Sequence, residues 1–257
     1  MCFGVVPERL STEMIPPFFP PAIPPSIVIG TEFDLTVEDA LIRQRLGKGA
    51  ERVLKSQRNI AIIEAAKREL AELARPAAAW AMFPVKGISH DKLVLENGVK
   101  IGGGPVTKIV CGAAELVAGV CTIGPGMEQK AKECMAAGES FHGIVLDLLA
   151  SWAAGAVREQ LVLQLQLDHY KARSWHASIH LGPGESAFPI TEQRVIFDLL
   201  KDEVARIGVR LEPSMLMVPI KSVSFIIGAG PNPLGQESGS QCEYCDKKDT
   251  CTHRKKQ

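Results

Sequence analysis

Residues 180–230 read HLGPGESAFPITEQRVIFDLLKDEVARIGVRLEPSMLMVPIKSVSFIIGAG. Pro183-Gly184 predicts a tight turn, because proline fixes one backbone angle and glycine tolerates the angles that follow. Pro189 suits the first turn of a helix, where the amide that proline lacks would have no helical partner. The stretch therefore opens with a loop that leads into a helix.

Apolar residues recur at helical spacing from residue 191 to residue 207, which predicts one amphipathic helix. Gly208 predicts its end, because glycine adopts the left-handed conformation of a helix C-terminus without steric clash. A short strand is expected over 209–211, a turn at 212–214 and a β-rich run over 222–227. The stretch thus predicts a loop, a helix, a strand, a turn and a second strand.

Four features of this stretch resemble the activation domain of cobalamin-dependent methionine synthase, and free-standing proteins built on it. They are the Pro-Gly turn, the helix led by Glu-Gln, the step IGVRL at 207–211 and the run PIKSVS at 219–224. Arg75-Pro76, the run TIGP at 122–125 with Glu128, and residues 143–157 extend the resemblance to about residues 70–230. It implies an α+β fold with a twisted, mostly antiparallel sheet and surrounding helices.

The remaining elements follow from periodicity. Residues 36–74 predict two helices broken near 47–49, and residues 127–137 and 140–164 predict two more, the second with small residues that permit close packing. Glu96-Asn97-Gly98 predicts a hairpin between strands at 92–95 and 99–101, after a strand at 79–85. In 106–121, a helix over 113–117 and a strand over 117–123 are both compatible with the pattern.

Size and composition leave room for one or two domains. The 257 residues carry 29 basic and 29 acidic side chains, so no charge excess favours a nucleic-acid partner. No apolar run reaches the ~18 residues that span a bilayer, and the first 30 residues lack the pattern of a secretory signal. We therefore expect a cytoplasmic protein without a membrane partner, and the oligomeric state stays open.

The composition divides the chain into three parts. Residues 1–35 form an arm, with six prolines among residues 14–25 that exclude a helix. Residues 36–230 form the α+β domain. Residues 231–257 comprise a polar linker and a cysteine-rich tail.

The tail contains the sharpest local motif, Cys242-x2-Cys245-x5-Cys251-x-His253. Two cysteines two residues apart reach one metal ion from a single turn, and a third cysteine with a histidine completes a tetrahedral zinc set. The same thiolates can instead hold a 4Fe-4S cluster with a fourth ligand from elsewhere. Both metals remain open, and free surface thiols are the plain alternative.

The Pro-Gly loop is the candidate ligand site, since amides at a helix N-terminus attract anions. In the family that it resembles, this loop contacts S-adenosylmethionine through an arginine and a tyrosine, which fall here at His180 and Glu185. Histidine cannot supply the two-pronged contact that arginine makes with a carboxylate. Glu185 places a negative charge where the ring of the family tyrosine would stack. The resemblance further implies contacts from the loop residues and an upstream acid for the methionyl amine: Gly182, Pro183, Gly184 and Asp147.

The resemblance implies an accessory protein for a corrinoid-dependent methyltransferase, one that helps to reactivate a cobalamin contributed by the partner. An iron-sulfur tail would add electron transfer. Two alternatives stay open: a corrinoid-protein assembly subunit with structural zinc and no reaction of its own, and a divergent S-adenosylmethionine-binding methyltransferase. No Ser-His-Asp order, HExxH motif or dinucleotide-binding fingerprint is present.

Overall fold

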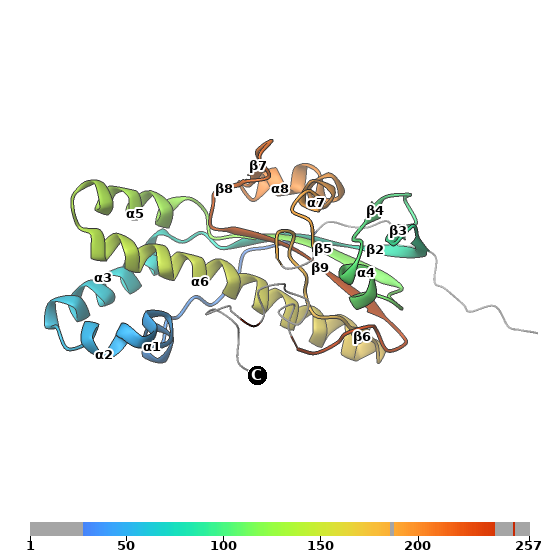
Figure 1. Cartoon of the computed structure of the whole chain (residues 1–257). Coiled ribbons are helices and arrows are strands. Elements are labelled where there is room, and N and C mark those ends of the chain that lie inside the picture. Colours follow the sequence, from blue (N-terminus) through green and yellow to red (C-terminus); the bar gives the residue numbers. More distant parts are fainter. Residues whose placement is uncertain (1–27, 186–187, 240–248, 250–257) are drawn as a thin grey trace, which may run out of the picture.

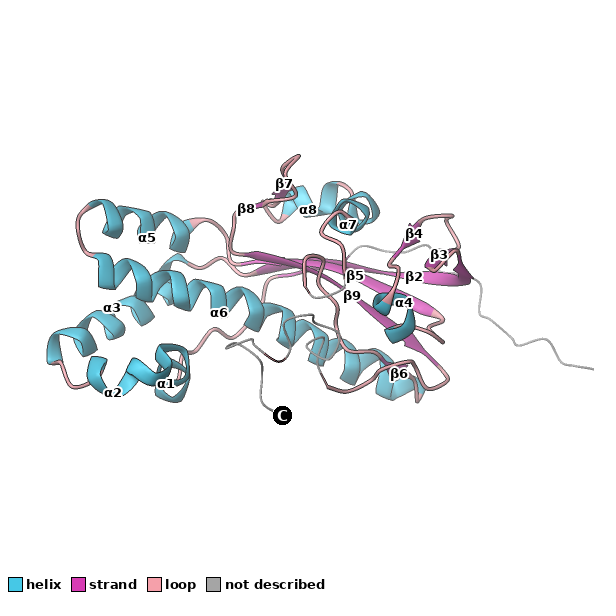
Figure 2. Ribbon diagram, viewed as in Figure 1, coloured by secondary structure: helices cyan, strands magenta, loops and turns pink. Residues whose placement is uncertain are grey.

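The computed structural model describes residues 28–185, 188–239 and 249, and the proline-rich residues 14–25 and the tail motif lie outside this part. Its centre is a seven-stranded antiparallel sheet in the order β4-β3-β2-β5-β9-β6, with β1 also paired to β2 (Figures 1 and 2). The strands are β1 (Val28–Gly30), β2 (Ala77–Ser89), β3 (Lys92–Leu95), β4 (Lys100–Ile101), β5 (Glu115–Thr122), β6 (His176–Ala177) and β9 (Ser222–Gly230). The expected α+β fold with an antiparallel sheet is confirmed.

Strand β5 is the middle of the sheet and is buried on both faces. It pairs along its whole length with β2 on one side and with β9 on the other. Because side chains alternate along a strand, Val117 and Cys121 enter one hydrophobic core, whereas Leu116, Ala118 and Val120 enter the other. The two cores thus lie on opposite faces of the same strand.

Helices cover both faces (Figure 1). The first core packs under α3 (Gln57–Leu73), α5 (Gly126–Ala136) and α6 (Ser140–Leu165), and the second under α4 (Pro105–Ile109), α7 (Glu192–Leu200) and α8 (Asp202–Arg206). Two short helices, α1 (Asp39–Leu46) and α2 (Ala50–Val53), precede α3, and a small hairpin of β7 (Arg210–Leu211) and β8 (Met217–Val218) follows α8. Beyond α6 the chain continues as a π-helical turn, Gln166–Tyr170, and a 3-10 turn, Lys171–Arg173.

The helical stretch Ser140–Arg173 is, within the described residues, long and apolar enough to cross a membrane by length and composition alone. Its apolar side chains supply the first core instead, and those buried include Leu146, Leu149, Ala153 and Leu161. Gly143 lies so close to α5 that a β-carbon added there would be 2.9 Å from Met135 Cγ. These contacts are those of a core helix, and the small residues provide the expected close packing.

Two of the predicted elements differ in the structure. The helix expected over 191–207 is two helices, because Lys201 has a positive φ of 51° and interrupts the helical hydrogen bonds between α7 and α8. Val204 still enters the same core as Ile196, so the apolar pattern continues across the break and hides it. In 106–121 the helix is α4, which starts at Pro105, and residues 113–117 are not helical.

The Glu-Gln pair at the start of α7 anchors this helix to two other elements. The buried Glu192 carboxylate lies 2.6 Å from Lys92 Nζ and accepts a hydrogen bond from the Gly102 amide at 3.0 Å. Gln193 donates to the Met215 carbonyl and accepts from the Ser224 hydroxyl. These bonds fix the helix that follows the candidate loop.

We predict that Gly119→Ala destabilises the protein, because the added β-carbon would lie 2.5 Å from the ring of Phe225, its partner on β9. Overpacking of a core lowers the free energy of unfolding by about 1–3 kcal/mol. Gly155→Ala is the matched control, since no atom lies within 4 Å of an added β-carbon in the middle of α6. Thermal or urea denaturation should show a loss for the first variant and a gain of about 0.5–1 kcal/mol for the second. Equal stability of the two variants would contradict the packing of β5 against β9.

Candidate functional site

The loop that precedes α7 is attached to the sheet edge and closed on itself. Leu181 forms an isolated antiparallel bridge with Ile226 of β9. The Gly184 amide donates to the Phe188 carbonyl at 2.8 Å, and the Glu185 amide donates to the Gly182 carbonyl at 3.0 Å. The predicted turn at Pro183-Gly184 is thus present as a compact hydrogen-bonded loop.

The amides expected to attract an anion at the start of α7 already have partners. The Glu192, Gln193 and Arg194 amides donate to the backbone carbonyls three residues earlier, at 3.0–3.2 Å. The reason is that residues 189–191 already form a turn that runs into the helix, so few of the usual unpaired donors remain. A ligand at this loop therefore needs a side chain to hold it.

Arg158 on α6 is the side chain that the structure brings to this loop. Its side chain is only 12% exposed, and Nη1 lies 3.6 Å from the Glu185 carboxylate. Nη2 lies 3.2 Å from Glu159, and the buried Nε has no hydrogen-bond partner in the described chain. His180 Nε2 lies 3.8 Å from the same Glu159 carboxylate. Arg158, Glu159, His180 and Glu185 therefore form one charged cluster, which we call the Arg158 cluster.

The chemistry of the Arg158 cluster is carboxylate recognition. A guanidinium presents a planar fork of donors that matches a carboxylate in two-pronged contacts. Here two glutamate side chains of the protein itself face that fork. The site thus holds a carboxylate-binding group that is already paired with carboxylates of the protein itself.

Sequence reasoning missed Arg158. The residue lies in an apolar helix, 27 positions before Glu185, and nothing local connects the two. The sequence feature that could have pointed to Arg158 is that it is the single arginine in a helix rich in small and apolar residues. A buried charge in such a helix requires a partner from another element.

Asp147 lies apart from the Arg158 cluster. It is also on α6, but the two residues are 11 positions apart, which corresponds to about 16 Å along the helix axis. Its carboxylate, 59% exposed, lies 2.6 Å from Lys221 Nζ, which also donates to Ser151 Oγ. His180, Gly182, Pro183, Gly184 and Glu185 thus share one loop, and Asp147 does not share it.

The comparisons with known proteins identify the family. The family model for the activation domain of vitamin B12-dependent methionine synthase matches residues 109–236, about half of the chain. These residues belong to the methionine synthase activation-domain family. The match runs from the end of α4 to beyond β9 and includes the candidate loop and Arg158.

A solved structure shares the activation-domain fold. The crystal structure of the MetH reactivation domain bound to AdoHcy matches with a TM-score of 0.58 and 17% sequence identity. The match covers 81% of this chain and 79% of that chain. No curated protein matches the sequence. The similarity of fold therefore extends beyond the residues that the family model covers.

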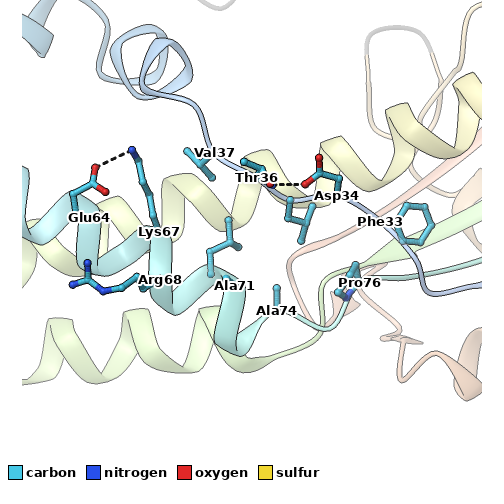
Figure 3. A pocket seen from close by; sticks show the side chains of 12 residues that line it. Phe33, Asp34, Thr36, Val37, Glu64, Lys67, Arg68, Ala71, Ala74 and Pro76 are labelled. Carbon is cyan, nitrogen blue, oxygen red and sulfur yellow. Dashed lines mark hydrogen bonds and ion pairs between the residues drawn. The ribbon is translucent and has the colours of Figure 1, made fainter.

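A groove of about 490 Å³ lies elsewhere, between α3 and the segment that follows β1 (Figure 3). It is lined by Phe33, Asp34 and Val37 on one side and by α3 residues such as Lys67 and Ala71 on the other. Lys67 is paired within it, with its ammonium 2.8 Å from Glu64 and 2.6 Å from Asp39. None of the residues predicted for the activation-domain site lines this groove.

The predicted metal ligands Cys242, Cys245, Cys251 and His253 lie outside the described residues. Among the described cysteines, Cys111, Cys121 and Cys134 are free thiols. Cys121 sits on β5, where burial raises the pKa of its thiol to about 12. It is therefore protonated at neutral pH and is a core residue in the activation-domain fold.

We predict that Gly184→Ala disturbs the candidate loop, because Gly184 has a φ of 86° and an added β-carbon would lie 2.9 Å from Ile190 Cδ1. The left-handed conformation destabilises a residue with a β-carbon by about 1–2 kcal/mol. Gly182→Ala is the control, since its φ is not positive and its nearest neighbour is the movable Glu185 carboxylate at 3.1 Å. Denaturation curves should show a loss of about 0.5 kcal/mol or less for the control. A larger loss for the control than for Gly184→Ala would contradict the loop geometry.

Proposed function

We propose that this protein assists the reactivation of a cobalamin cofactor carried by a corrinoid-binding methyltransferase or its corrinoid subunit. The observation that carries the proposal is the family match over residues 109–236, which contains the candidate loop, Arg158 and the strands β5 and β9. In vitamin B12-dependent methionine synthase the activation domain is one part of the enzyme. This chain would supply that part to a partner.

S-adenosylmethionine is the methyl donor that we propose for the Arg158 cluster, in keeping with the AdoHcy bound to the structurally similar MetH domain. Arg158 takes the place of the family arginine, whose position His180 occupies. Its guanidinium binds the amino-acid carboxylate of the ligand, and its unpaired Nε supplies a further donor. The ligand provides the methyl group for the partner's cobalt.

Glu185 controls access to Arg158 in this proposal. Its carboxylate, 3.6 Å from Nη1, stands where the ligand carboxylate binds and must move aside. The loop permits this movement, since Glu185 follows Gly184 and its side chain is half exposed. The protein thus binds S-adenosylmethionine in competition with its own glutamate.

We predict that Arg158→Gln weakens AdoHcy binding about 10- to 100-fold, the range for the loss of a hydrogen bond to a charged group. Glu185→Gln should tighten binding up to about 10-fold, because it removes the competing carboxylate. Isothermal titration calorimetry with AdoHcy measures both effects. Glu96→Gln, an exposed acid in the β3–β4 hairpin, is the matched control and should leave the affinity unchanged.

Two outcomes of the titration would refute this assignment. Equal AdoHcy affinity of the wild type and Arg158→Gln would show that Arg158 does not bind the ligand. No heat of binding for Glu185→Gln at millimolar AdoHcy would show that the protein does not bind AdoHcy. Circular dichroism of each variant establishes that the fold is intact.

The tail supplies the electron in our proposal. Return of cob(II)alamin to the reactive cob(I) form requires one electron, and Cys242, Cys245 and Cys251 match three ligands of a 4Fe-4S cluster. The cluster would receive that electron from an external one-electron donor and pass it to the partner's cobalt. A zinc ion held by the same cysteines and His253 would stabilise the tail without carrying electrons.

We expect anaerobically purified protein to be brown and to accelerate the loss of the cob(II)alamin absorption of a corrinoid-binding partner, given an electron donor and S-adenosylmethionine. Cys245→Ser should abolish both the colour and the acceleration, because it removes one cluster ligand. Cys111→Ser, an exposed thiol far from the tail in sequence, is the control and should preserve both. A colourless zinc protein without effect on cob(II)alamin would contradict electron transfer.

A second candidate function is a corrinoid-protein assembly subunit without a reaction of its own. The observation that favours it is the internal pairing of Arg158 with Glu159 and Glu185, which gives the guanidinium carboxylate partners without a ligand. Complex formation with the corrinoid partner that is indifferent to AdoHcy and to Arg158→Gln would support this function. For either function we propose the cytoplasm as the location, in keeping with the free described thiols.

A further inference from the structure

A second cluster of metal-ligating side chains lies at the turn between α5 and α6. Cys134 is in the last turns of α5, Glu139 directly precedes α6, and His142 lies in the first turn of α6. The Sγ, carboxylate and ring-nitrogen atoms of these residues all lie within 4.8 Å of one another. We call them the Cys134 cluster.

We propose that the Cys134 cluster binds a zinc ion through Cys134 Sγ, Glu139 Oε2 and His142 Nδ1, with a fourth position for water. Two distances carry this proposal: Cys134 Sγ lies 3.7 Å from His142 Nδ1, and Glu139 Oε2 lies 3.6 Å from the same nitrogen. Ligand atoms around tetrahedral zinc are separated by about 3.4–3.6 Å, given the usual bond lengths. Both distances to His142 Nδ1 are thus close to those between zinc ligands.

The histidine is already oriented for this role. Its other nitrogen, Nε2, lies 2.6 Å from the Glu69 carboxylate on α3. A proton on Nε2 that is donated to Glu69 leaves the lone pair of Nδ1 directed at Cys134 and Glu139. A carboxylate behind a metal-binding histidine is the common arrangement in zinc sites, because it fixes the tautomer and the ring. Glu69 is therefore a positioning residue.

The burial of Cys134 and His142 and the exposure of Glu139 fit the same assignment. Cys134 is 2% exposed and the His142 side chain 15%, whereas the Glu139 side chain is 62% exposed and free to move onto an ion. Glu139 makes no capping hydrogen bond to α6 through its side chain, and its carboxylate lies beside Cys134 and His142. An ion therefore has an entry path from the side of Glu139.

The chemistry of the three ligand atoms determines which metal ions the cluster favours. Thiolate and imidazole together favour zinc and other borderline transition ions, and a thiolate excludes magnesium and calcium. On binding, the Cys134 thiol proton passes to the solvent and the thiolate forms a bond to the ion. The ion would connect α5 and α6 directly, and α3 through Glu69.

This site is independent of the proposed function. His142 and Arg158 are 16 residues apart on α6, which corresponds to about 24 Å along the helix. The tail cysteines are a separate set of metal ligands, so they must be substituted before metal binding at the Cys134 cluster is measured. The 257-residue chain with Cys242→Ser, Cys245→Ser and Cys251→Ser provides that background.

The test is a titration of this background with Co²⁺ and Zn²⁺. We expect one cobalt ion with the charge-transfer absorption of a cobalt–thiolate bond, displacement of that ion by zinc, and a higher melting temperature with zinc. Cys134→Ala on the same background should abolish the absorption and the shift in melting temperature. Cys111→Ala, which removes an exposed thiol outside the cluster, is the control and should preserve both.

Glu69→Gln tests the positioning role. We expect zinc affinity to fall about 10- to 100-fold while the cobalt–thiolate absorption persists at saturation, because the ligands themselves remain. If the tail substitutions prevent folding, the same comparison is made in the native chain, where Cys134→Ala should lower the bound metal by one ion. Metal binding that is unchanged by Cys134→Ala, or no binding by the folded background at millimolar zinc, would overturn the proposal.

Discussion

The pairing of β5 with both β2 and β9 is the interaction on which the rest of the structure depends. All eight residues of β5 pair on each side, and its side chains enter the cores on both faces of the sheet. Gly119 makes this possible, since the Phe225 ring lies over it. The helices α6 and α7 pack on opposite faces of this strand, and β9 holds the candidate loop through Leu181.

The sequence predicted those parts of the fold that depend on local rules. The Asn97-Gly98 hairpin, the proline-led turn, and the helices at α5 and α6 follow from turn chemistry and periodicity, and the structure confirms them. Lys201 was not predictable, because the apolar pattern is the same whether one helix or two carry it. Arg158 was not predictable either, because its partner Glu185 comes from an element that only the tertiary fold brings near.

The Arg158 cluster is the site that we propose for the ligand of this chain. In our proposal, His180 and Glu185 stand where the family loop has an arginine and a tyrosine, and Arg158 supplies a guanidinium from α6. Glu185 then pairs with the guanidinium, as a ligand carboxylate would. The fold of the activation domain is thus kept, whereas the charges at its loop are rearranged. The Cys134 cluster lies toward the other end of the same helix, so α6 connects two sites of different chemistry.

The most direct test of this account is a crystal structure of the protein grown with AdoHcy. We predict that the amino-acid carboxylate of AdoHcy lies within hydrogen-bond distance of the Arg158 guanidinium, with the Glu185 side chain turned away from it. A carboxylate bound elsewhere while the contact between Arg158 and Glu185 persists would contradict it.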